Sequence, residues 1–174
     1  MKKSILTFLF LRYLILVILA VAFFSGDLIY NFLLKLTIIP SNLILNLFFN
    51  SITNHNFILM GNISIELIPA CIGISAYFLL FSLNLLTPIS PKKRFYSLLT
   101  SGVALLLFNI MRITIISSLY IKQIPYADLI HLSFWYFFNL LFILILWFGI
   151  TKLFKIKTIP VYSDFKTILR LYKK

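Results

Sequence analysis

Four stretches of this chain are apolar for about the length that a helix needs to cross a lipid bilayer. Such a helix takes about 20 residues. The four runs cover residues 5–24, 69–87, 96–117 and 129–150. Apolar residues make up 61% of the chain and charged residues only 11%, which is too little polar surface for a water-soluble domain. The sequence therefore predicts an all-α membrane protein: a single-domain, polytopic helical bundle with about four spanning helices.

The basic residues predict how this bundle is oriented. Lysine and arginine number 16 against 4 acidic residues, a net charge of +12. In a soluble protein this excess would suggest nucleic-acid binding, but here the charges lie in clusters between the apolar runs, so we expect no nucleic-acid partner. With four spans, twelve basic residues fall on one side, which the positive-inside rule makes cytoplasmic. They are Lys2, Lys3, Lys92, Lys93, Arg94, Lys152, Lys155, Lys157, Lys166, Arg170, Lys173 and Lys174. The sequence thus predicts a multi-pass protein of the cell membrane with both termini inside and a basic cytoplasmic tail over residues 151–174.

The first apolar run has a second interpretation. It follows two lysines and contains Ala20-Val21-Ala22, a small-residue pattern at which signal peptides are cut. However, Arg12 interrupts the run, and 20 residues is long for the apolar part of a signal peptide. The sequence favours a retained helix.

Residues 25–68 are mixed in character and are expected to lie at the outer face. The most apolar part, residues 36–49, is short for a span and contains Pro40, so it is predicted to be an interfacial or re-entrant helix. Further on, the β-prone runs 57–60 and 63–67 flank Gly61-Asn62 and predict a short hairpin.

Two candidate functional residues lie at the predicted outer ends of helices. Cys71 follows Pro69 in the first turn of a predicted helix, and a helix N-terminus favours the negative charge of a thiolate. Arg112 lies one turn after Asn109 on a stripe of small and polar residues, which predicts that it points into the bundle. Each has a plainer interpretation: an inert buried cysteine, or an arginine that reaches to the membrane interface.

His131 is the third candidate, in the first turn of the last predicted helix. Asp128 precedes it by three residues and is placed to accept a proton from its ring. Alone, His131 is as well explained as an interfacial histidine. The predicted topology, however, places Cys71, Arg112 and His131 on three helices at one depth. A thiol nucleophile, a cation for an oxyanion and an acid/base are the parts that acyl transfer needs, whereas the spacing of acids, histidines and the single cysteine suggests neither a metal site nor a cofactor.

The segment Pro69-Ala70-Cys71-Ile72-Gly73-Ile74-Ser75, followed by Asn109-Ile110-Met111-Arg112 and then His131, resembles the exosortase/archaeosortase family. Members are multi-spanning proteins with an Ala-Cys-Ser-Gly-like motif, an Asn-x-x-Arg motif and a later histidine. The resemblance covers residues 61–149 and is closer to the archaeosortase-like branches. Two features depart from the pattern: Ile72 stands where the common motif has serine, and no glycine closely follows His131.

The resemblance implies a membrane cysteine protease or transpeptidase. Its partners would be membrane-anchored proteins whose C-terminal sorting signal combines a short motif, a spanning helix and a basic end. Cleavage through a Cys71 thioester would pass the new C-terminus to water, a lipid or another cell-envelope acceptor. The family roles fall on Cys71 as nucleophile, Arg112 as carbonyl or oxyanion stabiliser and His131 as general acid/base, with Asn109, Asp128 and Ser75 in support.

A non-catalytic function is the alternative from another class. In a small-molecule-binding membrane subunit of a transporter, Arg112 and His131 would bind an anionic solute and Cys71 would be incidental. Cys71→Ser distinguishes the two, because a binding protein tolerates it and a thiol enzyme does not. Other protease mechanisms are disfavoured, since the sequence has no paired aspartates, no His-Glu-x-x-His and no Gly-x-Ser-x-Gly.

Overall fold

The structure is a computed structural model that describes residues 2–156 and is mostly helical. Met1 and residues 157–174, and with them most of the predicted tail, lie outside the described residues. The elements in chain order are α1 (Lys2–Ser25), α2 (Asp27–Asn46), β1 (Ser51–Asn54), β2 (Phe57–Met60), β3 (Ile63–Glu66), α3 (Pro69–Ile72), α4 (Ile74–Leu86), α5 (Pro91–Ile121), α6 (Ala127–Ser133), the π-helical turn η1 (Phe134–Phe138) and α7 (Asn139–Leu153).

Within the described residues, three helices are long and apolar enough to cross a membrane: α2, α5 and the continuous helix Ala127–Leu153 formed by α6, η1 and α7. The last two contain the predicted runs 96–117 and 129–150, and each extends beyond them. The protein is therefore a multi-pass membrane protein by helix length and composition.

The other expectations for spanning helices need correction. Residues 36–46 of the predicted interfacial segment form the second half of α2, which starts at Asp27 and continues through Pro40. The predicted span 69–87 is not one helix, because Gly73 divides it into α3, with 4 residues, and α4, with 13. The first run, by contrast, lies entirely within α1, a helix of 24 residues.

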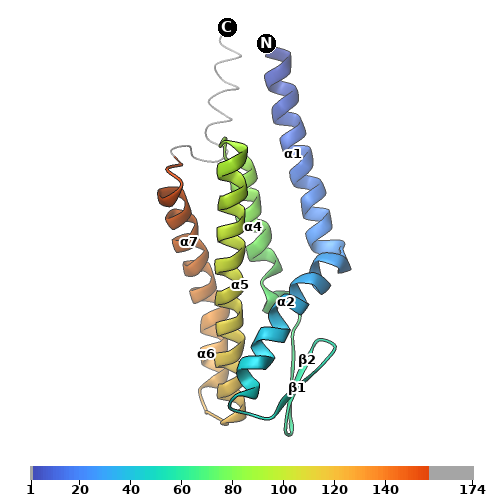
Figure 1. The fold of residues 1–174 in the computed structure, drawn as a ribbon, viewed down its shortest axis with the longest axis vertical. Coiled ribbons are helices and arrows are strands. Elements are labelled where there is room, and N and C mark those ends of the chain that lie inside the picture. Colours follow the sequence, from blue (N-terminus) through green and yellow to red (C-terminus); the bar gives the residue numbers. More distant parts are fainter. Residues whose placement is uncertain (1, 157–174) are drawn as a thin grey trace.

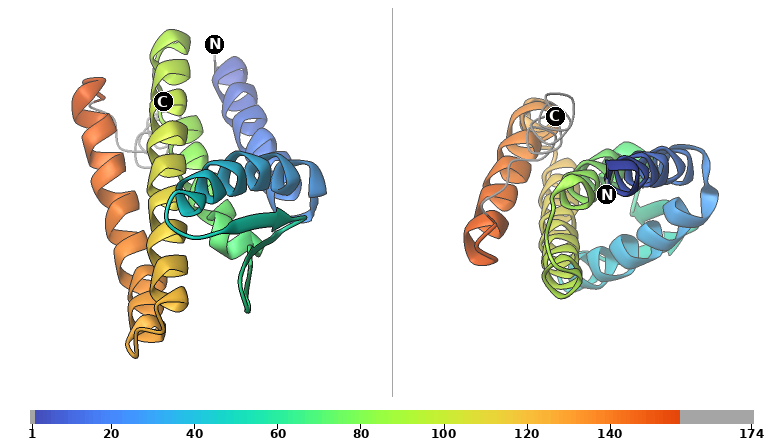
Figure 2. Two further views of the ribbon diagram at one scale, coloured as in Figure 1. Left: turned by 60° about the horizontal axis from the view of Figure 1, so that its bottom comes forward. Right: turned by 90° about the horizontal axis from the view of Figure 1, so that it is seen from above.

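α1, α4, α5 and α7 run roughly side by side, whereas α2 turns away from α1 and lies obliquely against the bundle (Figure 1). The oblique course of α2 is clearest in the two turned views (Figure 2). The α4–α5 connection lies at one end, where Lys93 Nζ donates a hydrogen bond to the Phe154 carbonyl oxygen at 3.2 Å. The sheet, α3 and α6 lie at the opposite end, which we call the α3–α6 end (Figure 1).

The sheet is antiparallel with strand order β1-β2-β3. The predicted hairpin is confirmed: Phe57 pairs with Glu66 and Met60 with Ile63, around a turn in which Gly61 has φ +58°. β1 was not predicted. It is tied to α2 because the Ser51 hydroxyl donates to the Asn42 carbonyl oxygen at 3.2 Å.

Polar contacts between helices support apolar packing in the bundle. Asn84 Nδ2 of α4 donates to Ser97 Oγ of α5 at 2.5 Å, and both residues are buried. Arg12 of α1 donates to the Leu86 carbonyl oxygen at 2.8 Å and so satisfies an end of α4 that lacks a helical partner. Such contacts suit a lipid environment, where unsatisfied polar groups are costly.

Candidate functional site

The segment that carries Cys71 is shaped by a glycine two residues later. α3 ends at Gly73, whose φ of +79° lies in the left-handed region that favours glycine. α4 starts directly afterwards, so the main chain makes a corner one residue after Ile72. Cys71 is partly buried at this corner and packs against the apolar core. The predicted placement at a helix N-terminus is correct only for a helix of four residues, too short for a strong helix dipole.

Two residues of α5 hold this corner by its main chain. Asn109 Nδ2 donates to the Ile72 carbonyl oxygen at 2.5 Å, and Arg112 Nη2 donates to the Cys71 carbonyl oxygen. Asn109 has no exposed surface, and Arg112 is only 4% exposed, so the arginine points into the bundle as predicted. The Asn-x-x-Arg pair thus binds two consecutive main-chain carbonyl groups, those of Cys71 and Ile72.

Gly73 also makes room for Asn109. A Cβ atom at position 73 would lie 2.9 Å from Asn109 Nδ2, closer than real Cβ contacts. The glycine is therefore required twice, for its backbone conformation and for the close approach of α5.

His131 lies on α6 beside the C-terminal part of α5. Tyr120 Oη donates to Asp128 Oδ1 at 2.7 Å and lies 3.3 Å from His131 Nδ1. Trp135 also contacts the imidazole ring, with ring centroids 6.3 Å apart. The expected direct bond from His131 to Asp128 is wrong: the carboxylate is bound by Tyr120, which stands between the two. α6 begins earlier than predicted, so His131 lies in its second turn.

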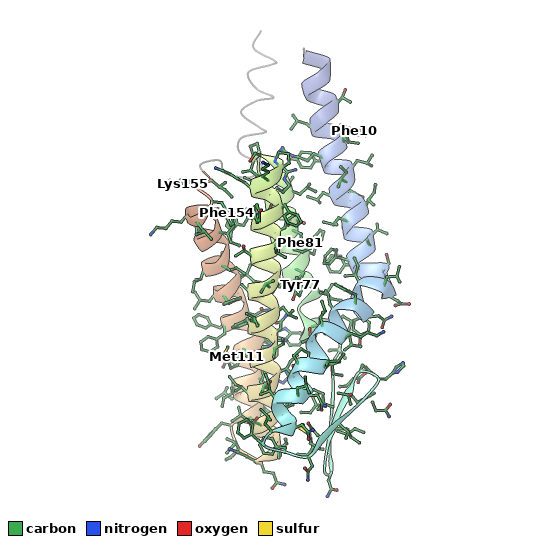
Figure 3. The ribbon with its side chains drawn as sticks, in the orientation of Figure 1. Phe10, Tyr77, Phe81, Met111, Phe154 and Lys155 are labelled. Carbon is green, nitrogen blue, oxygen red and sulfur yellow. The ribbon has the colours of Figure 1, made fainter. Side chains whose placement is uncertain are left out.

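Arg112 is the link between Cys71 and His131. Its guanidinium lies within electrostatic reach of the Cys71 thiol and of the His131 ring. α5 packs against both α3 and α6. No hydrogen bond joins His131 to Cys71 in the part of the chain that the structure describes. Met111, the neighbour of Arg112, marks this level on α5, and Phe154 and Lys155 mark the other end of the bundle (Figure 3).

Ser75, the remaining predicted residue, lies on a different side of the corner. It is exposed and lines a cavity of about 490 Å³ between the α1–α2 turn and α3. Asp27, Tyr30 and Glu66 also line this cavity, as does Ala70, the residue before Cys71. Ser75 is therefore next to the Cys71 segment without joining Arg112 or His131.

An apolar cavity of about 560 Å³ lies between α2, α4 and α5, and some of its lining side chains, such as Phe32 and Phe95, are exposed. Tyr77 and Phe81 of α4 contribute to its wall (Figure 3). Phe23 lines this cavity and the one beside Ala70, so the two adjoin.

Sequence reasoning missed two tyrosines at this end. Tyr120 was not singled out because an aromatic residue near a helix end is typical of membrane interfaces. Tyr30 of α2 donates to the Leu67 carbonyl oxygen at 2.9 Å and so fixes the chain just before α3. The i, i+8 spacing of Tyr120 and Asp128 across a turn is a local signal that could have suggested a contact.

Residues 2–156 contain no group of three or more His, Cys, Asp or Glu side chains placed to hold a metal ion. Comparisons with protein-family models, with curated proteins and with solved structures find no match to this chain. The chemistry of the site therefore has to be argued from its own residues.

Proposed function

We propose that the protein is a membrane-embedded cysteine peptidase or transpeptidase of the exosortase/archaeosortase type. The observation that supports this most is the grip of Asn109 and Arg112 on the main chain at Cys71 and Ile72. It fixes a thiol near a buried cation, and a histidine also lies within electrostatic reach of that cation. A binding site for an anionic solute would need the arginine but not this hold on the cysteine backbone.

In the proposed reaction, His131 takes the proton of the Cys71 thiol, and the sulfur attacks the scissile carbonyl carbon of a substrate peptide. One Arg112 N–H group is committed to the Cys71 carbonyl oxygen, and its other donors are available for the developing oxyanion. The carbon–nitrogen bond then breaks, and His131 gives the leaving amine its proton. The resulting thioester is attacked by water or by an acceptor nucleophile, which releases the Cys71 thiol.

The proposed substrate is a protein anchored by one C-terminal spanning helix that ends in basic residues. Such a substrate arrives by lateral diffusion and presents its cleavage motif just outside the bilayer. In the matching topology, α5 and the helix formed by α6, η1 and α7 cross the membrane in opposite directions, and the α3–α6 end is extracellular. Lys93 and Lys155 then lie at the cytoplasmic end, in accordance with the positive-inside rule.

The test is co-expression with a protein that carries such a signal. The C-terminal mass of that protein is compared for the native chain, Cys71→Ala and Cys71→Ser. Trimming by the native chain alone supports the proposal, and any added mass identifies the acceptor. Trimming by all three chains contradicts it, and a solute-binding function would leave the C-terminus whole in each.

A second measurement is independent of the choice of substrate. Cys71 is the only cysteine, so alkylation by iodoacetamide reports on this thiol alone. We expect Arg112→Gln to change the alkylation rate, because the Cys71 segment loses the hydrogen bond that Arg112 donates to its carbonyl oxygen. Lys122→Gln is the matched control, since it removes a positive charge from the exposed turn after α5.

A further inference from the structure

The unassigned polar cluster nearest the proposed site is formed by Tyr120, Asp128 and His131. Tyr120 comes from the last turn of α5, and the other two come from α6. The Tyr120 hydroxyl has one proton and two lone pairs. Its oxygen lies 2.7 Å from Asp128 Oδ1 and 3.3 Å from His131 Nδ1.

The proton of this hydroxyl can be placed by elimination. An ionised carboxylate only accepts hydrogen bonds, so the short contact requires the Tyr120 proton to point at Asp128. The Tyr120 oxygen then has only lone pairs left for His131. A favourable contact with Nδ1 therefore needs the proton on Nδ1, which leaves Nε2 with a free lone pair.

From this we infer that Tyr120 is a positioning residue that selects the His131 tautomer with a basic Nε2, and that Asp128 orients Tyr120 by accepting the proton of its hydroxyl group. The inference rests on the proposed function for its catalytic consequence but not for its structural content. Trp135 also packs against the imidazole ring, with ring centroids 6.3 Å apart.

The arrangement differs from the usual pairing of a histidine with a carboxylate. In that pairing the carboxylate binds the ring directly and stabilises the charged imidazolium. Here a neutral phenol stands between them and lengthens the path to Asp128. Tyr120 therefore sets the tautomer while adding little charge stabilisation.

The tautomer can be measured without any enzyme assay. The chain has two histidines, and His55→Gln leaves only the resonances of His131 in a ¹⁵N-histidine-labelled sample in detergent micelles. In that background we expect ring nitrogen shifts of an Nδ1-protonated imidazole, and Tyr120→Phe should lose this pattern. Tyr136→Phe is the matched control, because Tyr136 is 72% exposed on the following helical segment.

The outcome decides the inference whether or not the peptidase proposal holds. The inference is overturned if His131 is protonated on Nε2 in the His55→Gln protein that keeps Tyr120. It is also overturned if Tyr120→Phe leaves the ring nitrogen shifts unchanged. If the peptidase proposal holds, Tyr120→Phe should also lower kcat by about 10-fold or more with little change in KM, since a general base is misdirected and substrate contacts are kept. Loss of cleavage in Cys71→Ala with an unaltered tautomer in Tyr120→Phe would keep the peptidase and reject the Tyr120 inference.

Discussion

Gly73→Ala should destabilise the protein through two separate effects at one atom. Alanine at position 73 would have to adopt the left-handed φ of +79°, and this backbone strain costs about 1–2 kcal/mol of stability. The same Cβ would lie 2.9 Å from Asn109 Nδ2 and displace the hydrogen bond to the Ile72 carbonyl oxygen, which costs about 1–3 kcal/mol at a buried site. Together these effects predict a loss of about 2–5 kcal/mol.

Thermal unfolding in detergent measures this loss. For a chain of this size about 1 kcal/mol lowers Tm by about 2–4 °C, so Gly73→Ala should unfold roughly 4–20 °C below the native chain. Two other glycines separate the causes. At Gly61, with φ +58°, an added Cβ meets nothing within 4 Å, so Gly61→Ala is destabilised only by its backbone conformation. Gly102, inside α5, also faces open space, and Gly102→Ala should be neutral or slightly stabilising.

A double variant tests the proposed close approach. If Asn109 is what the new methyl group meets, Gly73→Ala should cost less in an Asn109→Ala background than in the native one. Equal costs in both backgrounds would refute the crowding argument. A Gly73→Ala protein as stable as Gly102→Ala would refute the account of the corner altogether.

Three other substitutions test contacts elsewhere in the bundle and at the site. Arg112→Lys should lower cleavage about 10–100-fold while the helical circular dichroism is kept, because an ammonium cannot serve the Cys71 carbonyl and an oxyanion together; unchanged cleavage would contradict this. Phe142→Leu should lower stability by about 0.5–1.5 kcal/mol in detergent unfolding, since it removes the stack on Phe108 with centroids 4.0 Å apart, and a value near zero would show that the stack contributes nothing. Ser97→Ala should lower stability by about 0.6–2 kcal/mol in the same assay, because it removes the hydrogen bond from Asn84. It should leave the alkylation rate of Cys71 unchanged, since Asn84 and Cys71 lie near opposite ends of the α3–α4 segment. An altered alkylation rate would contradict this.

Long apolar runs made the helical membrane class and two of its long helices predictable from sequence, because hydrophobic length is a property of a single segment. The limits of α2 were not predictable in the same way. Pro40 and Lys35 look like interruptions, yet a proline removes one backbone hydrogen bond without ending a helix that packs against its neighbours. The break at Gly73 was not predictable either, because a glycine within an apolar run can adopt helical or left-handed φ, and the sequence alone does not tell which.

Some features of the candidate site were likewise predictable from the sequence and others were not. Arg112, Asn109 and His131 could be singled out because polar groups within apolar helices are rare. That Asn109 and Arg112 bind main-chain carbonyl groups could not be foreseen, since carbonyl groups have no signature in a sequence. Tyr120 was missed because its importance comes from where the turn between α5 and α6 brings Asp128.

The π-helical turn η1, directly after α6, has a consequence for how this protein tolerates insertions and deletions. A π turn holds one more residue than an α-helical turn over the same path. Removing one residue from Phe134–Phe138 would therefore restore regular α-helical winding over that path and leave His131 of α6 beside Tyr120. Removing one residue from the regular helix α7 would instead turn the segments before and after the deletion by about 100° relative to each other. The π turn is thus a place in this long helix where a related chain could be one residue shorter and still keep the site.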